Sequence, residues 1–501
     1  MFESAELGIE IDKKTFAEEA PKVRAALLEA QKRLAASNQA VVVLVSGVEG
    51  AGKSETLNLL LEWMDARGIQ THTFGATHES DELWPEYWKY WSVLPPAGRL
   101  GIFFGSWYTR PIVGRTFGKM SSSAFDEALD RAVEFERMLA SENVLVVKLW
   151  LHLSKKAQKK RFKELGKSKK TAWQLGLRDK KYFKRYDEFK ANSELAIRRT
   201  STGEAPWHII EASDPRYRAL TVTRTLLQAI EERLAQAQAK KDKADKSKSK
   251  PKLPEPKPVN LLSELDYTKS LPDDEYGDKL LELQGRVNQL TYELGSQGRS
   301  AIFAFEGADA AGKGGAIRRL TQAMDARLYE VKSVAAPTDE ERAHPYLWRF
   351  WRALPRKGHV TIYDRSWYGR VLVERIEGFA ATEDWQRAYA EINSFEQQLE
   401  ESGTIVLKFW LAITSEEQLK RFKEREVTPY KQYKITEEDW RNRAKWNAYE
   451  AAACDMFEKT STSTAPWVLV ESVDKQWARI KIMKHVVKAL EHALGKKQRK
   501  K

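Results

Sequence analysis

The sequence of 501 residues predicts an α/β protein built from two tandem copies of one domain, each with a mostly parallel sheet between layers of helices. Three observations support this prediction. Whole motifs recur at one fixed spacing, short apolar runs alternate with amphipathic stretches, and a glycine-rich loop follows the first apolar run of each copy.

The internal repeat becomes visible when the sequence is shifted by 260 positions against itself. Three motif pairs then align without insertion or deletion: GVEGAGKS (47–54) with GADAAGKG (307–314), PEYWKYW (85–91) with PYLWRFW (345–351), and TSTGEAPW (200–207) with TSTSTAPW (460–467). We therefore predict an N-terminal domain over residues 1–235 and a C-terminal domain over 259–501. The Lys/Pro-rich segment 236–258 between them has the composition of an extended, solvated linker.

Within each copy, apolar runs predict the strands of the sheet. They are AVVVLVSG (40–47) and NVLVVKLWLHL (143–153) in the first copy, and SAIFAFEG (300–307), HVTIYDRS (359–366) and TIVLKFWLAI (404–413) in the second. Amphipathic helices are predicted over 126–140 and 386–400, each before the last of these strands. Strands that alternate with helices favour a parallel sheet covered on both faces.

Composition limits the protein's class and partners. The chain is 42% hydrophobic, begins without the pattern of a secretory signal, and has no run of about 18 apolar residues that would predict a membrane span. Its one cysteine, Cys454, is predicted to be a small core residue on a helix. We therefore expect a globular protein of the cytoplasm with no membrane partner.

The positive charge is concentrated in two short segments. Of the net charge of +13, residues 240–258 contribute +5 (eight Lys, three acids), and the last six residues contribute another +5. Charge runs of this kind are typical of solvated linkers and tails, so we do not expect nucleic acid as a partner.

Both copies contain a glycine-rich loop between a predicted strand and a predicted helix, the arrangement of a phosphate-binding P-loop. The first copy has Ser54 after the lysine of this loop, where a hydroxyl can bind magnesium, whereas the second copy has Gly314. By this criterion alone, the first copy would be the working one. The loop residues are Gly47, Gly50, Gly52 and Lys53 in the first copy, and Gly307, Gly312, Lys313 and Gly314 in the second.

The acidic residues reverse this ranking. Asp364 ends a predicted strand next to the loop, where P-loop enzymes place an acid that holds magnesium. Its counterpart 260 positions earlier is Phe104, and the counterpart of Arg365 is Gly105. Because neither Phe nor Gly has a side chain that binds a metal ion, we predict that the chemistry belongs to the C-terminal copy.

A basic, helix-like stretch over residues 420–445 follows the last predicted strand and is typical of a helical lid that closes over phosphates. Its alternative interpretation is a solvated helical face. Arg421 has a counterpart in Arg161, whereas Arg425 corresponds to Leu165 and Lys434 to Gln174. The charge of the predicted lid is therefore partly lost in the first copy.

Together, the motifs GADAAGKGG, YDRSWYGRVLVER, LKRFKER and TSTSTAPW resemble the second family of polyphosphate kinases, over residues 10–235 and 260–494. The resemblance implies two thymidylate-kinase-like P-loop kinase domains, each with a helical lid. It also implies Mg²⁺-dependent, reversible phosphoryl transfer from inorganic polyphosphate to a nucleotide, without a covalent intermediate. Members with two fused domains convert AMP to ADP, and a homodimer or larger assembly is expected.

The resemblance also assigns roles to residues of the C-terminal copy. Asp309 and Asp364 would hold Mg²⁺. These two acids would act with four cations in catalysis: Lys313, Arg365, Arg421 and Arg425. The phosphates would be bound by Gly307, Gly312, Lys313, Gly314, Arg370, Arg375 and Lys434. The first copy would be a structural partner that guides polyphosphate, since its loop is compatible with phosphate binding without turnover.

Two alternative functions stay open on the sequence alone. The chain could be an ATP-dependent nucleoside monophosphate kinase, since the P-loop and lid are shared with such enzymes. It could also be a non-catalytic module that binds polyphosphate or nucleic acid. The sequence leaves undetermined the choice between AMP and GMP, the physiological direction, the polyphosphate length and the position of the base pocket.

Overall fold

The computed structural model describes residues 1–75, 82–167, 177–246 and 260–495. It divides into two compact units, formed mainly by residues 1–252 and 253–501. Each unit contains a five-stranded, fully parallel sheet, in the order β2-β3-β1-β4-β5 in the first and β7-β8-β6-β9-β10 in the second. The same strand order in both units agrees with the internal repeat.

The strands confirm the five predicted runs and add five that the sequence analysis did not list. In the first unit they are β1 (Ala40–Gly47), β2 (Ile69–Thr73), β3 (Leu100–Phe104), β4 (Val144–His152) and β5 (Trp207–Glu211). In the second unit they are β6 (Ser300–Gly307), β7 (Tyr329–Ser333), β8 (Val360–Asp364), β9 (Thr404–Ala412) and β10 (Trp467–Glu471). Four of the additional strands are the two outermost ones of each sheet, the fifth is β3, and each of the five has only five residues.

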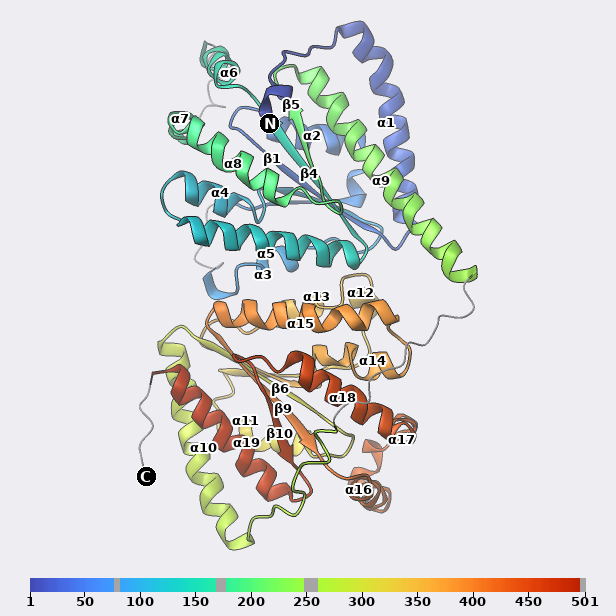
Figure 1. Ribbon diagram of the computed structural model, residues 1–501, viewed down its shortest axis with the longest axis vertical. Coiled ribbons are helices and arrows are strands. Elements are labelled where there is room, and N and C mark those ends of the chain that lie inside the picture. Colours follow the sequence, from blue (N-terminus) through green and yellow to red (C-terminus); the bar gives the residue numbers. More distant parts are fainter. Residues whose placement is uncertain (76–81, 168–176, 247–259, 496–501) are drawn as a thin grey trace. The chain divides into compact units, whose positions relative to one another are not determined.

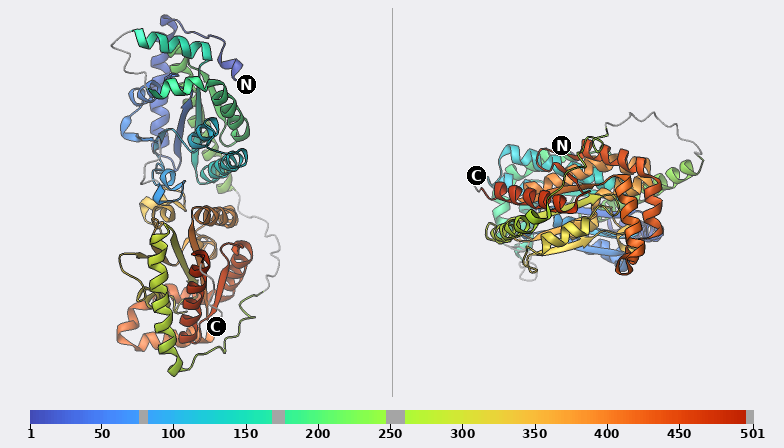
Figure 2. Two further views of the ribbon diagram at one scale, coloured as in Figure 1. Left: turned by 90° about the vertical axis from the view of Figure 1, so that its left-hand side faces the viewer. Right: turned by 90° about the horizontal axis from the view of Figure 1, so that it is seen from below.

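Helices cover both faces of each sheet (Figures 1 and 2). In the first half of the chain they are α1 (Lys13–Ala35), α2 (Lys53–Trp63), α3 (Trp88–Trp91), α4 (Thr109–Thr116), α5 (Ser122–Ser141), α6 (Lys155–Lys167), α7 (Leu177–Lys184), α8 (Tyr186–Thr200) and α9 (Pro215–Lys246), with 3-10 turns η1 (Phe2–Ala5) and η2 (Ala66–Gly68). The predicted helix over 126–140 is the central part of α5.

In the second half the helices are α10 (Asp273–Ser296), α11 (Lys313–Thr321), α12 (Asp339–Arg342), α13 (Trp348–Arg352), α14 (Val373–Ile376), α15 (Thr382–Glu401), α16 (Ser415–Val427), α17 (Glu437–Ala444), α18 (Trp446–Thr460) and α19 (Lys475–Ala493), with 3-10 turns η5 (Trp367–Arg370) and η6 (Pro429–Lys434). Strand β9 shows how the layers form. Lys408 contacts Glu396 of α15, whereas the next residue, Phe409, packs on His485 of α19. Successive residues of a strand point to opposite faces, so both faces of the sheet are buried.

The predicted linker is partly helical. Helix α9 continues to Lys246, so residues 236–246 are not extended as their composition suggested, and residues 247–258 lie outside the described part of the chain. The run of Ala, Gln and Lys from 235 to 241 explains the difference, because these residues have high intrinsic helix propensity.

A buried polar cluster recurs in both units and explains why both copies contain the sequence Ser-Trp-Tyr, at 106–108 and 366–368 (the SWY motif). The Trp367 indole and the Tyr368 hydroxyl donate to the carboxylate of Glu396 at 3.0 and 2.7 Å, and Lys408 contacts the same carboxylate at 2.7 Å. In the first unit Trp107, Tyr108 and Lys148 make the same three contacts to Glu136, at 3.0, 2.7 and 2.6 Å. The cluster therefore holds the fold together rather than performing chemistry.

Cys454 is a core residue as predicted, and tryptophans that recur in both copies are buried as well. Trp91, Trp107, Trp351 and Trp367 are at most 2% exposed, and Cys454 is buried on α18. Among the helices of the described ranges, none combines the length and apolar character that a membrane crossing requires.

Candidate active site

The glycine-rich loop of the second unit connects β6 to α11. A Cβ atom at Gly307 would lie 2.4 Å from the carbonyl oxygen of Leu411, so this position accepts only glycine. Gly312 caps α11 with a left-handed backbone (φ 107°), which glycine adopts without penalty. The Lys313 ammonium donates to the carbonyl oxygens of Gly307 and Ala308 at 2.8 and 3.2 Å. The loop thus presents a lysine that no carboxylate of the described residues neutralises by direct contact.

Asp309 lies in this loop and contacts the turn after β8. Its Oδ1 accepts a hydrogen bond from Arg365 at 2.9 Å, and its Oδ2 accepts one from Asn442 of α17 at 2.8 Å. Burial by itself would raise the pKa of Asp309, but the charges of Lys313 and Arg365 and the bond from Asn442 lower it below its usual value. Asp309 is therefore an ionised carboxylate that joins the loop, the turn and the lid.

Asn442 extends this contact into the helices after β9. The Tyr449 hydroxyl of α18 donates to Asn442 Oδ1 at 3.1 Å, while Asn442 Nδ2 donates to Asp309. The amide can serve both neighbours because it carries a donor and an acceptor. In the first copy the counterparts of Asn442 and Tyr449 are Tyr182 and Phe189.

Substituting Asn442 by Asp tests this link between lid and loop. The new carboxylate would lie beside Asp309 and repel it, whereas Asn442→Ala removes the bond without adding charge. We expect Asn442→Asp to lower kcat/KM for AMP, the acceptor that the sequence resemblance implies, about tenfold more than Asn442→Ala. Steady-state assays of the two purified variants measure this difference, and equal losses would contradict it.

Asp364 is the carboxylate best placed to hold a metal ion. It ends β8, is partly exposed, and none of the described residues donates a hydrogen bond to its side chain or pairs with it. Within the described residues no group of three or more His, Cys, Asp or Glu side chains forms a metal site. An open carboxylate of this kind fits Mg²⁺, which usually binds one or two protein carboxylates and fills its other positions with water and phosphate oxygens.

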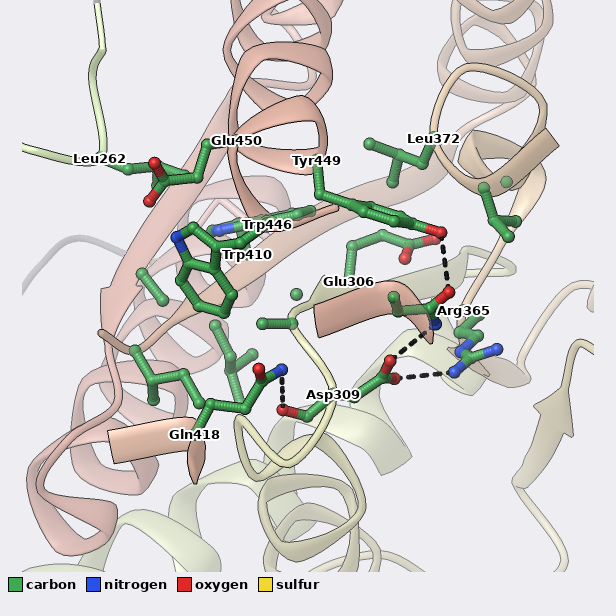
Figure 3. Close-up of a pocket in the computed structure, with 18 residues that line it drawn as sticks. Leu262, Glu306, Asp309, Arg365, Leu372, Trp410, Gln418, Trp446, Tyr449 and Glu450 are labelled. Atoms are coloured by element: carbon green, nitrogen blue, oxygen red, sulfur yellow. Dashed lines mark hydrogen bonds and ion pairs between the residues drawn. The ribbon is translucent and has the colours of Figure 1, made fainter. Parts of the chain in front are cut away.

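A pocket opens beside Asp309 and Arg365 (Figure 3). Its polar wall includes Glu306, Gln418 and Asn442. Its other lining is mostly apolar and aromatic: Leu262, Leu372, Val373, Trp410, Trp446 and Tyr449. Apolar walls with a few fixed polar groups are typical of sites for small organic ligands.

A second pocket lies on the other side of the loop and is basic. The cations among its lining residues are Arg421, Arg425, Lys475 and Arg479, and the lining includes Gly312 and Gly315 but no aromatic residue. Arg421 is 4% exposed and donates to the carbonyl oxygens of Ala310 and Ser472 at 2.9 and 2.7 Å. Arg421 thus fastens the base of the lid to the glycine-rich loop.

The remaining predicted residues lie in different surroundings. Arg370 pairs with Glu374 at 2.9 Å, and Arg375 pairs with Asp455 at 2.7 Å while its guanidinium stacks on Trp385. Gly314 belongs to the first turn of α11. Lys434 ends η6, and its side chain lies outside what the structure describes. The structure therefore brings Gly307, Asp309 and Arg365 to one pocket, and Gly312, Arg421 and Arg425 to the other.

Sequence reasoning missed Glu306, Asn442, Tyr449, Trp410, Trp446 and Gln418. A signal for two of them was present, because the repeat replaces Glu306 by Ser46 and Asn442 by Tyr182. A comparison of the two copies position by position would have identified Glu306 and Asn442 as residues that differ between them.

The first copy neutralises its glycine-rich loop with its own carboxylates. Lys53 pairs with Glu49 at 2.9 Å. Glu55, in the first turn of α2, pairs with Arg161 at 2.7 Å and with Arg218 at 2.8 Å. The counterparts of Glu55 and Arg218 in the second copy are Gly315 and Ala478, which line the basic pocket.

The first copy also has larger side chains at positions that line the apolar pocket of the second. Phe2 and His152, the counterparts of Leu262 and Ala412, stack with ring centroids 4.4 Å apart, and both are fully buried. Together with Phe104 and Gly105, these contacts leave the first copy without the arrangement seen around Asp309.

Comparison with known proteins agrees with this organisation. The family model of polyphosphate kinase 2 matches residues 10–238 and 270–499. A protein of Pseudomonas aeruginosa named polyphosphate:AMP phosphotransferase is 49% identical over 99% of this chain and 100% of its own length. A protein of the same name from Acinetobacter johnsonii is 39% identical over 93% of this chain and 94% of its own.

The fold is similar to a crystal structure from Pseudomonas aeruginosa described as a polyphosphate kinase 2. The two share a TM-score of 0.89 and 48% identity, over 99% of this chain and 100% of the other. The twofold family match, the full-length relatives and the shared fold agree with the glycine-rich loop and the Asp-Arg turn found above. The chain belongs to the polyphosphate kinase 2 family, with two tandem domains of that family.

Proposed function

We propose that this protein transfers the terminal phosphoryl group of inorganic polyphosphate to AMP and so forms ADP, with the reaction located in the C-terminal copy. The observation that carries this proposal is the asymmetry of the two copies: only the second joins Asp309 and Arg365 beside an open carboxylate, Asp364. Full-length relatives named polyphosphate:AMP phosphotransferase support it.

Catalysis would rest on alignment and on charge. A phosphate oxygen of AMP is already ionised, so the attack needs no general base and no covalent enzyme intermediate. Lys313 and Arg365 would place positive charge at the transferred group, where negative charge spreads in the transition state. Asp364 would hold Mg²⁺, with Asp309 beside it. The ion supplies further neutralisation of phosphate charge when it is bound.

The apolar pocket is the proposed site of AMP. Its aromatic wall of Trp410, Trp446 and Tyr449 offers a surface for a base and ribose, while Arg365 lies at the end where the phosphate would be placed. Planar aromatic side chains are suited to bind bases by stacking.

The basic pocket is the proposed entry of the donor. Arg425, Lys475 and Arg479 suit an inorganic polyanion, and the lining has no aromatic residue against which the base of a donor nucleotide would stack. This composition favours polyphosphate over ATP. Two different pockets that contact one glycine-rich loop, together with Asp364 at the end of β8, favour an enzyme over a binding module.

The N-terminal copy is proposed to be a domain without turnover. Its loop lysine and its arginines are paired with internal carboxylates, so they are not available to an added polyanion in the arrangement described. The predicted boundaries of the domains, the homo-oligomeric state and the cytoplasmic location stay predictions.

A donor-exchange assay tests the reaction. Purified protein with AMP and Mg²⁺ is expected to form ADP with long-chain polyphosphate, and to form it at least about a hundredfold more slowly with ATP alone, because the donor pocket lacks a surface for a base. Equal rates with both donors would favour the ATP-dependent kinase, and no product with either donor would favour a binding module.

A further inference from the structure

Glu306 is a buried carboxylate at the end of β6, next to the glycine-rich loop. It is 5% exposed, and its Oε1 accepts hydrogen bonds from both the backbone N–H and the hydroxyl of Ser366, each at 2.8 Å. Strand β6 is the neighbour of β8 in the sheet, so this carboxylate reaches directly into the turn after β8. Glu306 therefore holds the residue that follows Arg365.

The turn that Glu306 holds has an unfavourable backbone. Arg365 has a left-handed conformation (φ 63°), which residues with a side chain seldom adopt. Its counterpart in the first copy is Gly105 (φ 82°), for which this conformation carries no penalty. A strained arginine persists only where surrounding bonds fix its conformation. The two hydrogen bonds from Ser366 to Glu306 are bonds of that kind.

The first copy satisfies the same backbone group in another way. There the N–H of Ser106 donates to the hydroxyl of Thr109 at 2.9 Å, and the counterpart of Glu306 is Ser46. In the second copy the counterpart of Thr109 is Gly369, which lines the apolar pocket. The backbone N–H of this serine thus bonds to a side chain of the same turn in the first copy, and to a side chain of the neighbouring strand in the second.

Because Glu306 supplies the acceptor in the second copy, position 369 needs no side chain there. The heavy atom nearest to a Cβ built at Gly369 is Cγ1 of Val373 at 3.9 Å, and the backbone there is not left-handed. A Cβ atom would therefore fit at this position without strain, and any larger side chain would add atoms to the wall of the pocket. Neither backbone conformation nor packing of the turn accounts for glycine here.

We propose that Glu306 is a positioning residue of the C-terminal copy, which holds the strained Arg365 turn from β6 and so allows Gly369 to leave the acceptor pocket open. The proposal rests on the proposed function, because it takes this pocket as the AMP site. Glu306 acts through Ser366 and Arg365.

The test compares Glu306→Gln, Glu306→Ser and the double variant Glu306→Ser with Gly369→Thr. Gln keeps an acceptor oxygen in reach of Ser366, so its kcat is expected within about threefold of the parent protein, whereas Glu306→Ser is expected to lose about tenfold to a hundredfold. Glu306→Ser should also lower the melting temperature. The added threonine should restore that temperature by bonding Ser366 as Thr109 bonds Ser106, and should raise KM for AMP about tenfold by occupying the pocket wall.

Thr109→Gly in the first copy is the matched control. It removes the equivalent hydrogen bond, so it should lower the melting temperature and leave kcat and KM for AMP unchanged. Equal losses of kcat in Glu306→Gln and Glu306→Ser would overturn the proposal, because the charge itself would then act on substrate or metal. An unchanged KM in the double variant would overturn the role of Gly369.

Binding measurements separate this proposal from the proposed function. Calorimetric titration of the parent and double variants with AMP, without polyphosphate, reports on the pocket even where turnover is absent. If the parent protein binds AMP but forms no ADP from polyphosphate, the proposed function fails, and the difference in affinity between the two proteins still decides the role of Gly369. If the parent protein does not bind AMP, the inference fails with its premise.

Discussion

Asp364→Asn is expected to lower kcat/KM for AMP with polyphosphate by about a thousandfold or more, which corresponds to roughly 4 kcal/mol of transition-state stabilisation. The reason is local. Asp364 lies at the end of β8, and none of the described residues forms a hydrogen bond or ion pair with its carboxylate. The neighbouring Arg365 donates a hydrogen bond to Asp309 instead. Asparagine keeps the shape and removes the charge that would hold Mg²⁺.

The matched control is Phe104→Leu, at the same place in the N-terminal copy, which should leave kcat/KM within about twofold of the parent value. Both variants are compared at several Mg²⁺ concentrations, and circular dichroism checks that they are folded. Activity that survives Asp364→Asn would mean either that the N-terminal copy turns over or that the metal is held elsewhere.

Lys313→Ala is the second substitution with a large expected effect. We expect a loss of about a thousandfold in kcat/KM, because the lysine would contact the transferred phosphoryl group and its charge would be used most in the transition state. The equivalent substitution in the first copy, Lys53→Ala, is expected to change kcat/KM less than about twofold, since Lys53 is already paired with Glu49.

The comparison of Lys313→Ala with Lys53→Ala is informative because the two loops have similar backbone conformations. Gly52 and Gly312 both cap the following helix with a left-handed conformation, and both lysines donate to the carbonyl oxygens of the strand end. A large loss in both variants would contradict the assignment of the chemistry to one copy. It would indicate that the N-terminal loop binds polyphosphate that the C-terminal copy uses.

The duplication separates structural from chemical features of the chain. The Trp and Tyr of the SWY motif form a cluster with a Glu and a Lys in both copies. The three bonds to the Glu carboxylate have the same lengths in the two copies to within 0.1 Å. The two residues that precede the SWY motif differ between the copies: they are Asp364 and Arg365 in the second copy and Phe104 and Gly105 in the first. Fold stability requires the cluster in each domain, whereas one set of charges is enough for one active site.

The sequence by itself determined the duplication, five of the six central strands of the two sheets, the glycine-rich loops and the copy that carries the acids. These features depend on local patterns, namely apolar runs, glycine spacing and the offset of 260 positions, which need no knowledge of tertiary contacts. The outermost strands, such as β2 and β7, escaped prediction because each has five residues with little buried apolar surface.

Only the tertiary structure decided which charges are used inside the protein and which face the pockets. Arg421 and Arg375 have the same charge in the sequence as Arg365, yet one is bonded to buried carbonyl oxygens and the other to Asp455, each far away along the chain. Glu306 gained a role only when β6 and β8 became neighbours and placed Ser366 beside it. The physical reason is that the pairing of a side chain depends on which strands and helices meet in the fold, and residue spacing along one chain does not encode those meetings.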